Sequence, residues 1–508
     1  MELEYICHSS IFIKTGDTNI LFDPWFEGPA YHQQWHVFPK PVNTLQLQSA
    51  QNIIITHGHE DHLHTATLKT LPKGARVFFP YQWRAGAKEY FGHMGFKDVT
   101  EAISFKTYQL GVNTKITYIG FALESTVVIE AEGKVLVNIN DSLNSHHQNV
   151  VDVFVMEIKK RWPVIDYLIS GWSGAGYFPN TVHYQNKDDV EVAKIREQYF
   201  ANHLCKIIHA LQPKSVIPFA PGFVLLRNDK QWINEIKFPR TYLKEYYNKY
   251  FELNNGKKFI IMQPGDIIAN DIHEKISPYH QLEIKNSINH LIAVQYEKEI
   301  IASNAFSTVP KKMLSELVNK VLNLVNKNTK LYSNEVLLDT CFSLNFADAE
   351  ETIFYNFVFH AGEFNFTTTS IQSPQSKLLI TTWSYLLQSC MDKEWGGDIL
   401  TIGYGLDVYV YDEMTLEKNL DIVCGRLISR FPSAQNDLRK NPLRALKFYF
   451  NQPMLARLAL KQKVKLRSAV NKYPYNERDH WITYTKCELC KVCNIPLLSY
   501  EFGERMSN

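Results

Sequence analysis

The sequence predicts an α/β domain followed by a smaller α+β domain, and three observations support this prediction. Over residues 1–272, short apolar strands alternate with helical segments. Over residues 273–433, aromatic-rich alternating strands are mixed with helices. Residues 434–508 form a basic, largely helical tail that ends in a cysteine cluster. A chain of 508 residues is also too long for one ordinary core.

In the first segment, the elements follow from hydrophobic periodicity. Residues 125–131 and 134–140 have the spacing of two strands joined by a tight turn. Residues 188–212 predict one long helix, because apolar residues from Phe200 to Leu211 recur at helical spacing. Apolar runs predict further strands at 52–56, 77–80, 165–170, 215–219 and 259–262.

The second segment has an α+β pattern of its own. Residues 311–327 predict a helix, and residues 335–370 predict alternating strands. Residues 376–389 predict a further helix, and residues 398–410 predict more strand. In the tail, residues 434–472 predict helices.

Composition and charge show no special bias. Apolar residues make up 45% of the chain and charged residues 21%, as in soluble globular proteins, and the formal net charge is +2. No apolar run approaches the roughly 20 residues needed to cross a bilayer, and we expect no signal peptide. Eight cysteines in so long a chain fit a reducing compartment, so we expect a cytoplasmic protein.

The most informative residues come just after the strand predicted at 52–56. His57, His59, Asp61 and His62 stand there within six positions. Strand ends are where α/β proteins build sites, and imidazole and carboxylate are preferred ligands of zinc and iron. A buried cluster of this kind is hard to satisfy without a metal. The spacing therefore predicts a metal site.

This spacing resembles the H-x-H-x-D-H pattern of the metallo-β-lactamase superfamily. The resemblance implies an αββα sandwich, in which two facing sheets are covered by outer helices. It also implies that His57 and His59 bind one metal ion, and that Asp61 and His62 bind a second.

Two further residues take supporting roles by the same resemblance. Asp23 ends a strand that begins at Asn19, and it would orient a ligand histidine from behind. The alternative for Asp23 is an Asp-Pro turn former. His64 lies outside the pattern, so we expect it to support a ligand from behind or to be solvated.

The third and last histidines of the superfamily pattern are missing here. The third precedes the hairpin, and Glu124 holds that position. We expect Glu124 to bind metal one; the alternative is an exposed glutamate at a strand end. Asp141, at the end of the hairpin, would bridge the two metals. The last histidine is replaced in Pro218-Phe-Ala, which leaves the sixth ligand open. Candidates for it are His146, His147 and His183.

Carboxylates in place of imidazoles change the expected metal. Oxygen-rich ligand sets favour iron or manganese over zinc. We therefore expect two iron ions, with zinc or manganese as alternatives. An open position on the second metal would leave room for O₂ or a substrate.

With these departures, the first half of the chain resembles one branch of the superfamily. This branch is the metal domain of the CMP-N-acetylneuraminate hydroxylases, and other diiron oxygenases of the same fold are similar. The matching segments are residues 124–141, residues 170–179 and Pro218-Phe-Ala, with a fainter match at 396–404. The sialate hydroxylases carry an N-terminal Rieske domain, for which we expect no room here.

The resemblance implies an O₂-dependent monooxygenase. Asp61, Glu124 and Asp141 would be the catalytic residues. The substrate would be a polar or anionic small molecule, nucleotide-sugar-like or carrier-linked, and an electron donor would be required. The alternative is a hydrolase of a phosphodiester, lactone or amide, in which Asp61 orients a metal-activated water. A third interpretation is a non-catalytic binding protein with a residual metal core.

Cysteines near the C-terminus also have metal-ligand spacing. Cys487, Cys490 and Cys493 stand at two-residue gaps, and His480 precedes them. We expect a structural zinc site or an iron–sulfur centre here, or cysteines that bind no metal.

Two other features have open interpretations. A glycine-rich loop carries Trp172, Ser173 and Tyr177, which would line a substrate pocket or form a packing turn. Residues 430–472 contain eleven Lys or Arg against one acid. This stretch is a solvated face or docks an anion such as a nucleotide, a phospho-carrier or a lipid headgroup. Nucleic acid is not expected, because no aromatic stacking motif accompanies the charge. The oligomeric state stays open.

Overall fold

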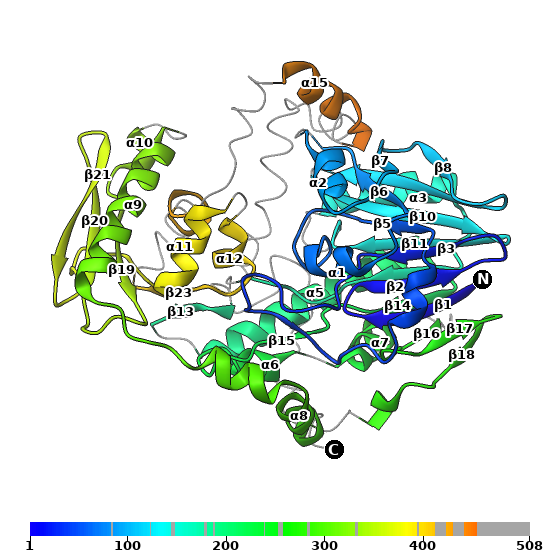
Figure 1. The fold of residues 1–508 in the computed structure, drawn as a ribbon, viewed down its shortest axis with the longest axis horizontal. Coiled ribbons are helices and arrows are strands. Elements are labelled where there is room, and N and C mark those ends of the chain that lie inside the picture. The colour runs from blue at the N-terminus through cyan, green and yellow to red at the C-terminus, as the bar shows by residue number, and fades with distance from the viewer. Residues whose placement is uncertain are drawn as a thin grey trace.

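Two facing β-sheets with helices on their outer sides form the first part of the fold, and a third sheet stands beside them (Figure 1). This αββα arrangement with a smaller α+β part confirms the predicted fold class. We describe it from a computed structural model. The structure describes residues 1–82, 85–121, 123–143, 148–176, 180–185, 188–237, 239–251, 258–281, 285–330, 334–393, 396–411, 423–429 and 441–454.

The first sheet has eight strands in the order β18-β17-β1-β2-β3-β5-β6-β7. Neighbours from β18 to β3 are antiparallel, and β3, β5, β6 and β7 run parallel. The parallel strands therefore end at one edge of the sheet. The bounds are β1 (Glu2–Cys7), β2 (Ser10–Lys14), β3 (Asn19–Phe22), β5 (Asn52–Ile54), β6 (Arg76–Pro80), β7 (Val99–Ala102), β17 (Ile267–Ala269) and β18 (Ile272–Glu274).

The second sheet has seven strands in the order β16-β14-β12-β11-β10-β9-β8. The predicted hairpin is present as β10 and β11, and β11, β12, β14 and β16 run parallel. The bounds are β8 (Thr107–Gln109), β9 (Thr114–Phe121), β10 (Glu124–Ala131), β11 (Lys134–Asn140), β12 (Tyr167–Ser170), β14 (Ser215–Pro218) and β16 (Lys258–Phe259).

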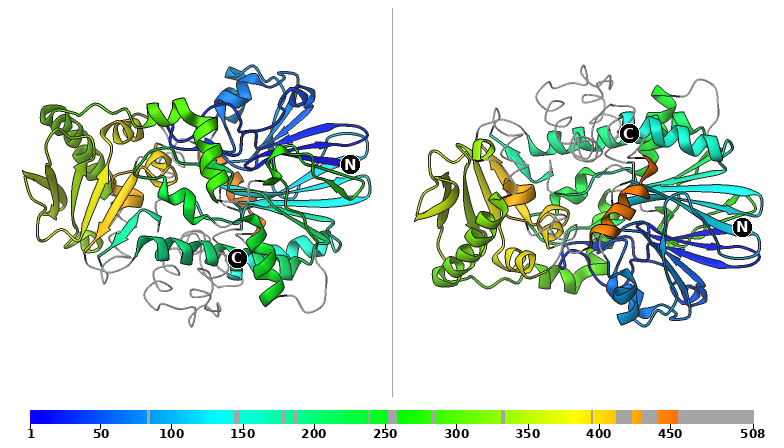
Figure 2. Two further views of the ribbon diagram at one scale, coloured as in Figure 1. Left: turned by 90° about the horizontal axis from the view of Figure 1, so that it is seen from below. Right: turned by 90° about the horizontal axis from the view of Figure 1, so that it is seen from above.

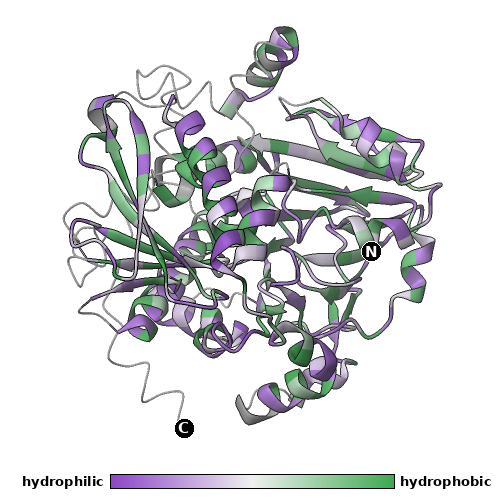
Figure 3. Cartoon of the chain, turned by 60° about the vertical axis from the view of Figure 1, so that its left-hand side comes forward, coloured by the Kyte–Doolittle hydropathy of each residue, from purple (hydrophilic) through white to green (hydrophobic). Residues whose placement is uncertain are grey.

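Alternation along the strands separates the core between the sheets from the cores under the helices. Ile54 faces the inter-sheet core, whereas its neighbour Ile53 packs under the outer helices. Figure 2 shows the helices on the outer sides of the two sheets, and Figure 3 shows apolar residues concentrated on the strands. α1 (Thr65–Thr70) and α2 (Ala87–His93) cover the first sheet, and α3 (Gln148–Arg161), α5 (Asp189–Leu211) and α7 (Arg240–Tyr250) cover the second.

The third sheet has six strands in the order β13-β23-β22-β19-β20-β21. Helices α9, α11 and α12 share its hydrophobic core. The bounds are β13 (Val182–Tyr184), β19 (Cys341–Phe346), β20 (Phe354–His360), β21 (Glu363–Thr369), β22 (Leu378–Thr382), β23 (Leu406–Val410), α9 (Lys311–Thr329), α11 (Ser384–Asp392) and α12 (Gly397–Thr401).

Shorter elements connect these layers. β4 and β15 pair with each other in a two-stranded sheet. Among the described residues, no helix combines the length and apolar character needed to cross a bilayer. The remaining bounds are β4 (His36–Val37), β15 (Phe223–Val224), α6 (Trp232–Ile236), α8 (Lys285–Ser303), α10 (Asn334–Leu337), α15 (Pro442–Phe450), the short helices η1 (Leu45–Ser49) and η2 (Pro278–Gln281), and the π-helix η4 (Val423–Leu427).

Two segments cross the domain boundary predicted at residue 272. β13 comes from the first segment of the sequence but is the edge strand of the third sheet, where it pairs parallel with β23. α8 follows the boundary but packs on the first domain, where Tyr296 donates a hydrogen bond to the Val37 carbonyl and clusters with Val224 and Leu226. The third sheet therefore contains residues that precede position 272, and residues that follow this position pack on the sandwich.

Two elements predicted in the second segment are wrong in type. The helix predicted at 376–389 is β22 followed by α11. The apolar and β-branched side chains of β22 suit a strand that pairs on both sides, with β19 and β23. The strand predicted at 398–410 begins as α12 and becomes β23 only at Leu406. Of the helices predicted at 434–472, α15 lies within the described residues.

Candidate metal centre

The predicted ligands gather at one edge of the sandwich, where strands of both sheets end. His57 follows β5 of the first sheet, and Asp141 follows β11 of the second. Asp23 follows β3 and receives a hydrogen bond of 2.8 Å from the Thr56 backbone N–H to its Oδ1. This bond ties the ends of two parallel strands together and places His57 at the edge.

The candidate ligand atoms form two overlapping groups among the described residues. His57, His62 and Asp141 make one group, and His8, Asp61 and His62 make the other. Within each group, the ligand atoms all lie within 4.8 Å of one another. The Asp141 Oδ2 lies 3.7 Å from His57 Nε2 and 3.4 Å from His62 Nε2. Asp141 therefore lies beside both His57 and His62, which are the predicted ligands of two different metal ions, and its carboxylate is placed where it could contact both.

The donor set fits a cation. His62 Nε2 is buried and has no hydrogen-bond partner of acceptable geometry among the described residues. It nevertheless faces two carboxylate oxygens, Asp61 Oδ2 at 3.1 Å and Asp141 Oδ2 at 3.4 Å. A nitrogen lone pair that faces two carboxylates is repelled unless a positive charge lies between them. His57 Nε2 and His59 Nδ1 likewise approach to 2.8 Å.

Electrostatics keep two of these side chains in the form that binds metal. Burial, together with the neighbouring His62 and His59, lowers the pKa of His57 well below its usual value. Burial alone would raise the pKa of Asp61, but the neighbouring charge of His62 and the hydrogen bond with His8 hold it well below its usual range. Burial by itself would lower the pKa of His62. The carboxylates of Asp61 and Asp141 outweigh burial and raise this pKa well above its usual value. A positive charge on or beside His62 is therefore favoured.

Asp23 is fully buried behind the cluster. Its Oδ2 accepts a hydrogen bond of 2.7 Å from Thr56 Oγ1 and lies 3.2 Å from His62 Nδ1. The Asn140 side-chain amide donates to the same oxygen at 2.5 Å. Asp23 thus contacts a predicted ligand histidine from behind, and Asn140 is a buried partner that the sequence analysis did not single out.

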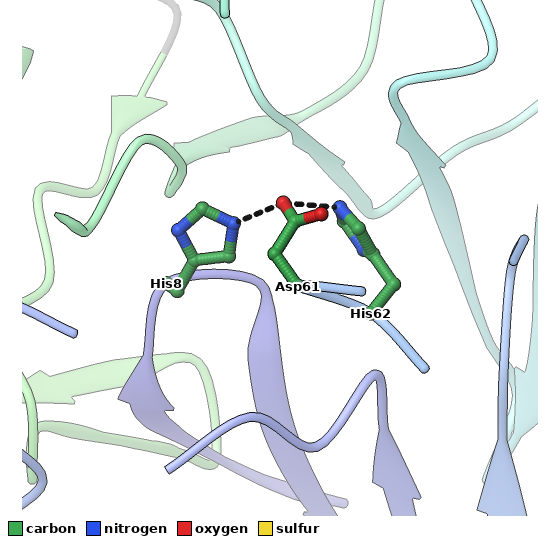
Figure 4. A group of neighbouring side chains, drawn as sticks. All are labelled: His8, Asp61 and His62. Atoms are coloured by element: carbon green, nitrogen blue, oxygen red, sulfur yellow. Dashed lines mark hydrogen bonds and ion pairs between the residues drawn. The ribbon is translucent and has the colours of Figure 1, made fainter. Parts of the chain in front are cut away.

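Two residues absent from the sequence prediction hold Asp61 from opposite sides. The Tyr31 hydroxyl donates to Asp61 Oδ1 at 2.5 Å, and His8 Nε2 lies 2.9 Å from Asp61 Oδ2. Figure 4 shows Asp61 between His8 and His62. The signal for His8 was a polar turn, Cys7-His-Ser-Ser10, between two apolar strands. Burial lowers the pKa of His8.

Glu124 stands at the start of β10 and belongs to neither ligand group. The hydroxyl of the next residue, Ser125, donates to the Thr56 carbonyl, so this strand end lies beside the residue that precedes His57. The Glu124 side chain lines a small pocket together with Tyr81, Gln82, Asn451 and Gln452. Its predicted role as a ligand stays a prediction.

The basic segment reaches the same region through α15. Arg444 pairs with Glu101 and lies over the Tyr81 ring, 4.5 Å from its centroid. Lys447 lies 5.4 Å from the same centroid. These two basic residues therefore pack on the metal domain.

The second domain reaches the centre through α12. The Gln34 side-chain amide donates to the carbonyl of Ile399 at 2.7 Å and to that of Tyr31 at 2.9 Å. Asp398, at the start of α12, interacts electrostatically with His59 and Asp61. Burial raises its pKa to about 6, with His59 opposing and Asp61 adding to the shift.

Other predicted residues serve packing and capping. The His64 side chain caps α1 by accepting from the Thr67 N–H, and its Nε2 lies 3.2 Å from the Pro29 carbonyl. Trp172 is buried beside Tyr242, and Ser173 donates to Glu197 at 2.8 Å. These contacts match the packing alternative for the glycine-rich loop.

His183 does not supply the sixth ligand. His183 lies on β13 of the third sheet. Its ring nitrogens lie 2.7 Å from Asp189 Oδ2 and 3.1 Å from Asp407 Oδ1. The remaining candidates lie outside the described residues. These are His146, His147, Tyr177, His480, Cys487, Cys490 and Cys493.

Comparison with known families agrees with this geometry. Residues 2–168 match the family described as "Beta-lactamase superfamily domain". This match covers the first sheet except for β17 and β18, and it covers the β10–β11 hairpin. Both groups of candidate ligands lie within it.

Curated relatives match the first half of the chain at low identity. The chain is 24% identical over 258 residues to cytidine monophosphate-N-acetylneuraminic acid hydroxylase of Danio rerio. The matched region covers 46% of this chain and 40% of that protein. It is 24% identical over 290 residues to the Homo sapiens protein described as inactive cytidine monophosphate-N-acetylneuraminic acid hydroxylase. This match covers 53% of the chain and 52% of that protein. The Mus musculus hydroxylase is 23% identical over 256 residues, covering 46% and 41%. The chain thus spans about half or less of the length of these relatives.

Solved structures with similar folds are more distant. CmlA, a diiron beta-hydroxylase from Streptomyces venezuelae, is 17% identical with a TM-score of 0.35, covering 51% of this chain and 52% of that one. A possible metal-dependent hydrolase from Veillonella parvula is 13% identical with a TM-score of 0.38, covering 53% and 98%. At these TM-scores the likeness says nothing about activity.

Proposed function

Because residues 2–168 form a β-lactamase superfamily domain, we propose that this chain is a dinuclear-metal enzyme, an iron-dependent hydroxylase that uses O₂. The observation that carries the proposal is the pair of overlapping ligand groups, in which Asp141 Oδ2 lies 3.7 Å from His57 Nε2 and 3.4 Å from His62 Nε2, one predicted ligand of each metal. Each group contains a carboxylate, Asp141 in one and Asp61 in the other. Mixed imidazole and carboxylate donors suit iron.

The residues divide between two metal positions. His57 and His59 would hold metal one together with Glu124, and Asp61 and His62 would hold metal two. Asp141 would lie between the two metals. When bound, the metals would supply the redox chemistry with O₂, which side chains cannot supply.

The chain's own residues position the ligands and restrict water. His57, Asp61 and His62 are at most 5% exposed, so these candidate ligands are shielded from solvent. Asp141 has a side chain that is 33% exposed and is the open member of the cluster. A substrate would therefore approach over Asp141. Excluding water from the rest of the centre limits side reactions of an oxidising site.

The names of the relatives support a polar or anionic substrate. Three of them are described as hydroxylases of cytidine monophosphate-N-acetylneuraminic acid, one of these as inactive. We propose a small-molecule substrate of that chemical class, nucleotide-linked or carrier-linked. An O₂-dependent hydroxylation also needs an electron donor, which would be a separate partner.

One observation favours a second candidate, a metal-dependent hydrolase. Glu124 lies in neither ligand group, and without it metal one has the nitrogen donors of His57 and His59. Nitrogen-rich sites suit zinc, which lowers the pKa of a bound water. Asp61 would then orient that water for attack on a phosphodiester, lactone or amide.

Metal quantification in the purified full chain separates the two functions. The chain is expressed with iron and zinc both supplied, purified without oxygen, and its iron and zinc are counted. The hydroxylase predicts two iron ions per chain, and O₂ uptake once the protein is reduced with dithionite. Stoichiometric zinc without iron would support the hydrolase. Metal beyond two per chain that is lost in Cys490→Ser would belong to the cysteine cluster.

The role of Glu124 is tested in the same way. Glu124→Gln should lower iron retention at least about tenfold, because an amide is a much weaker ligand than a carboxylate. Glu124→His should favour zinc. Glu130→Gln is the matched control, since Glu130 lies on the same strand but pairs with Lys115 at the surface. Full iron retention in Glu124→Gln would show that Glu124 does not bind metal.

A further inference from the structure

His8 enters the metal centre from a part of the chain far from the other ligands in sequence. It lies in the turn between β1 and β2 and is 3% exposed. Its Nε2 lies 2.9 Å from Asp61 Oδ2, on the side of Asp61 opposite to His62 (Figure 4). By distance alone, His8 belongs with Asp61 and His62 as a candidate ligand. Its hydrogen bonds contradict that role.

His57, a histidine that does fit a metal, carries a proton on Nδ1. Thr56 Oγ1 donates its hydrogen to Asp23 at 2.7 Å, so it can only accept from His57 Nδ1 at 3.1 Å. The lone pair of His57 is therefore on Nε2, the atom that faces Asp141 and His59. His62 Nδ1 lies between an acceptor, Asp23 Oδ2 at 3.2 Å, and a donor, the Asn140 side-chain amide at 3.0 Å, so its contacts suit either tautomer.

His8 has the opposite arrangement. The backbone N–H of Gly222 donates to His8 Nδ1 at 3.0 Å. A backbone N–H has no lone pair, so Nδ1 of His8 must accept and cannot carry a proton. The proton of the ring is then on Nε2, where it is donated to Asp61 Oδ2. A nitrogen that carries a proton has no lone pair for a metal ion.

Close packing fixes this arrangement. A Cβ placed on Gly222 would lie 2.8 Å from both the Cα and the backbone N of His8. Only glycine lets the chain after Pro218 approach His8 so closely. This is the segment in which the superfamily's last histidine is missing.

We propose that His8 is a positioning residue, held by Gly222 in the tautomer that donates to Asp61, and not a metal ligand. His8 and Tyr31 then donate to the two different oxygens of Asp61 and fix its carboxylate plane. Among the described residues, metal two keeps the protein ligands Asp61, His62 and Asp141. The proposal rests on the dinuclear centre proposed above.

Nitrogen NMR of the wild-type chain labelled with ¹⁵N-histidine tests the tautomer directly. In metal-free protein, the His8 Nε2 should show the shift of a protonated ring nitrogen and Nδ1 that of an unprotonated one. His57 should show the reverse. His8 is assigned by the resonance lost in His8→Gln. A protonated Nδ1 on His8 would overturn the proposal, whether or not the chain binds metal.

Metal affinity tests the role. His8→Gln keeps a side-chain N–H donor near the position of Nε2, so we expect two metals per chain and an affinity within about threefold of wild type. His8→Ala loses the donor, and a supporting contact of this kind is worth roughly 10- to 100-fold in affinity for the second metal. Asp61→Asn is the reference for a lost ligand. His36→Gln, at another buried histidine, is the control for the substitution itself.

The outcomes separate the two proposals. If His8→Gln holds one metal per chain, as expected for Asp61→Asn, His8 is a ligand and the inference is wrong, while the dinuclear function stands. If wild type binds no metal under either supply, the proposed function fails, and the nitrogen shifts still decide the His8 tautomer. If His8→Ala does not fold, His8→Gln and the wild-type spectrum carry the test.

Discussion

Asp61 shows how this centre is built from single contacts. Its two oxygens receive different donors, Tyr31 on Oδ1 and His8 on Oδ2. His62, its neighbour in sequence, is oriented from behind by Asp23. Both of these candidate ligands therefore contact residues that are themselves buried, which would fix their geometry before a metal binds.

Tyr31→Phe removes one of these donors with little change in shape. We expect the affinity for the second metal to fall roughly 10- to 100-fold, because Asp61 Oδ1 loses its partner. Without metal, the loss of one buried hydrogen bond should lower stability by about 1–3 kcal/mol. Chelator competition measures the affinity, and thermal denaturation of the metal-free protein measures the stability.

Tyr404→Phe is the matched control for this substitution. Tyr404 is equally buried and accepts a hydrogen bond from Asn180 instead of contacting a candidate ligand. Tyr404→Phe should change the stability of the protein but leave its metal affinity within about twofold of the wild-type value. An equal loss of affinity in both variants would mean that Tyr31 acts through packing.

Part of this centre could be predicted from local spacing. His57, His59, Asp61 and His62 stand close together in sequence after one strand, so a motif finds them. Tyr31 and His8 reach the centre from separate turns, and only the three-dimensional arrangement of β1, β2 and the following loop brings them to Asp61. A single sequence holds no record of such contacts, and the tautomer of His8 depends on Gly222, more than 200 residues away.

At the scale of secondary structure, α5 is the longest described helix and begins with a side-chain cap. Asp188 accepts a hydrogen bond of 2.9 Å from the Glu191 backbone N–H. This carboxylate also lies at the positive end of the helix dipole. The start of α5 carries Asp189, which contacts His183, so the cap lies close to the junction between the domains.

Asp188→Ala should weaken the first turn of α5. Loss of an N-cap costs about 1 kcal/mol, and the effect is local because the rest of the helix is buried. Hydrogen exchange at the amides of residues 190–193 should be roughly fivefold faster, which is the same free energy expressed as a rate. Asp188→Asn keeps an N-cap oxygen and should exchange nearly as wild type. Faster exchange along all of α5 would contradict a local role.

Element types were predictable where periodicity was long and undisturbed. The long helix and the β10–β11 hairpin occur as expected, because their apolar residues repeat over many positions. β22 and α11 are adjacent in sequence, and the apolar run of β22 by itself predicts the start of a helix. Short apolar runs do not distinguish a buried strand from a buried helix. In this case the pairing of β22 with β19 and β23 decides the type.

Across the whole molecule, an ionic cluster joins segments that are distant in sequence. His183 on β13 contacts Asp189 and Asp407, and the buried Lys230 pairs with Asp407. Burial lowers the pKa of His183, but hydrogen bonds to Asp189 and Asp407 raise it more, to about 9. The imidazole is therefore charged at neutral pH and links the first domain to the third sheet.

This cluster predicts a pH dependence at the alkaline side. The folded pKa of His183 is raised, so its contribution is fully present below the unfolded value near 6.5 and is lost as pH rises through about 9. The upper bound on that contribution is about 3 kcal/mol. The thermal midpoint should fall between pH 6.5 and 9 in wild type, and this fall should be smaller in His183→Asn. His360→Asn, at an exposed histidine of the same sheet, is the control.

An unchanged alkaline profile in His183→Asn would contradict the proposed link.

The domain organisation itself was predictable only in outline. Composition separates the two halves near residue 272, but it cannot show that three residues of the first half, Val182–Tyr184, complete the third sheet. Such an exchange depends on how the chain passes between the domains, and short strands leave little trace in periodicity.

Since β13 comes from the first half of the sequence, a continuous fragment of the C-terminal half would lack the edge strand of the third sheet. A fragment starting after residue 274 would leave the outer edge of β23 uncovered, with its backbone N–H and C=O groups available to other chains. Aggregation of that fragment is the expected result. A soluble version of this half would therefore need residues 180–185 joined to it, so that β13 can cover β23.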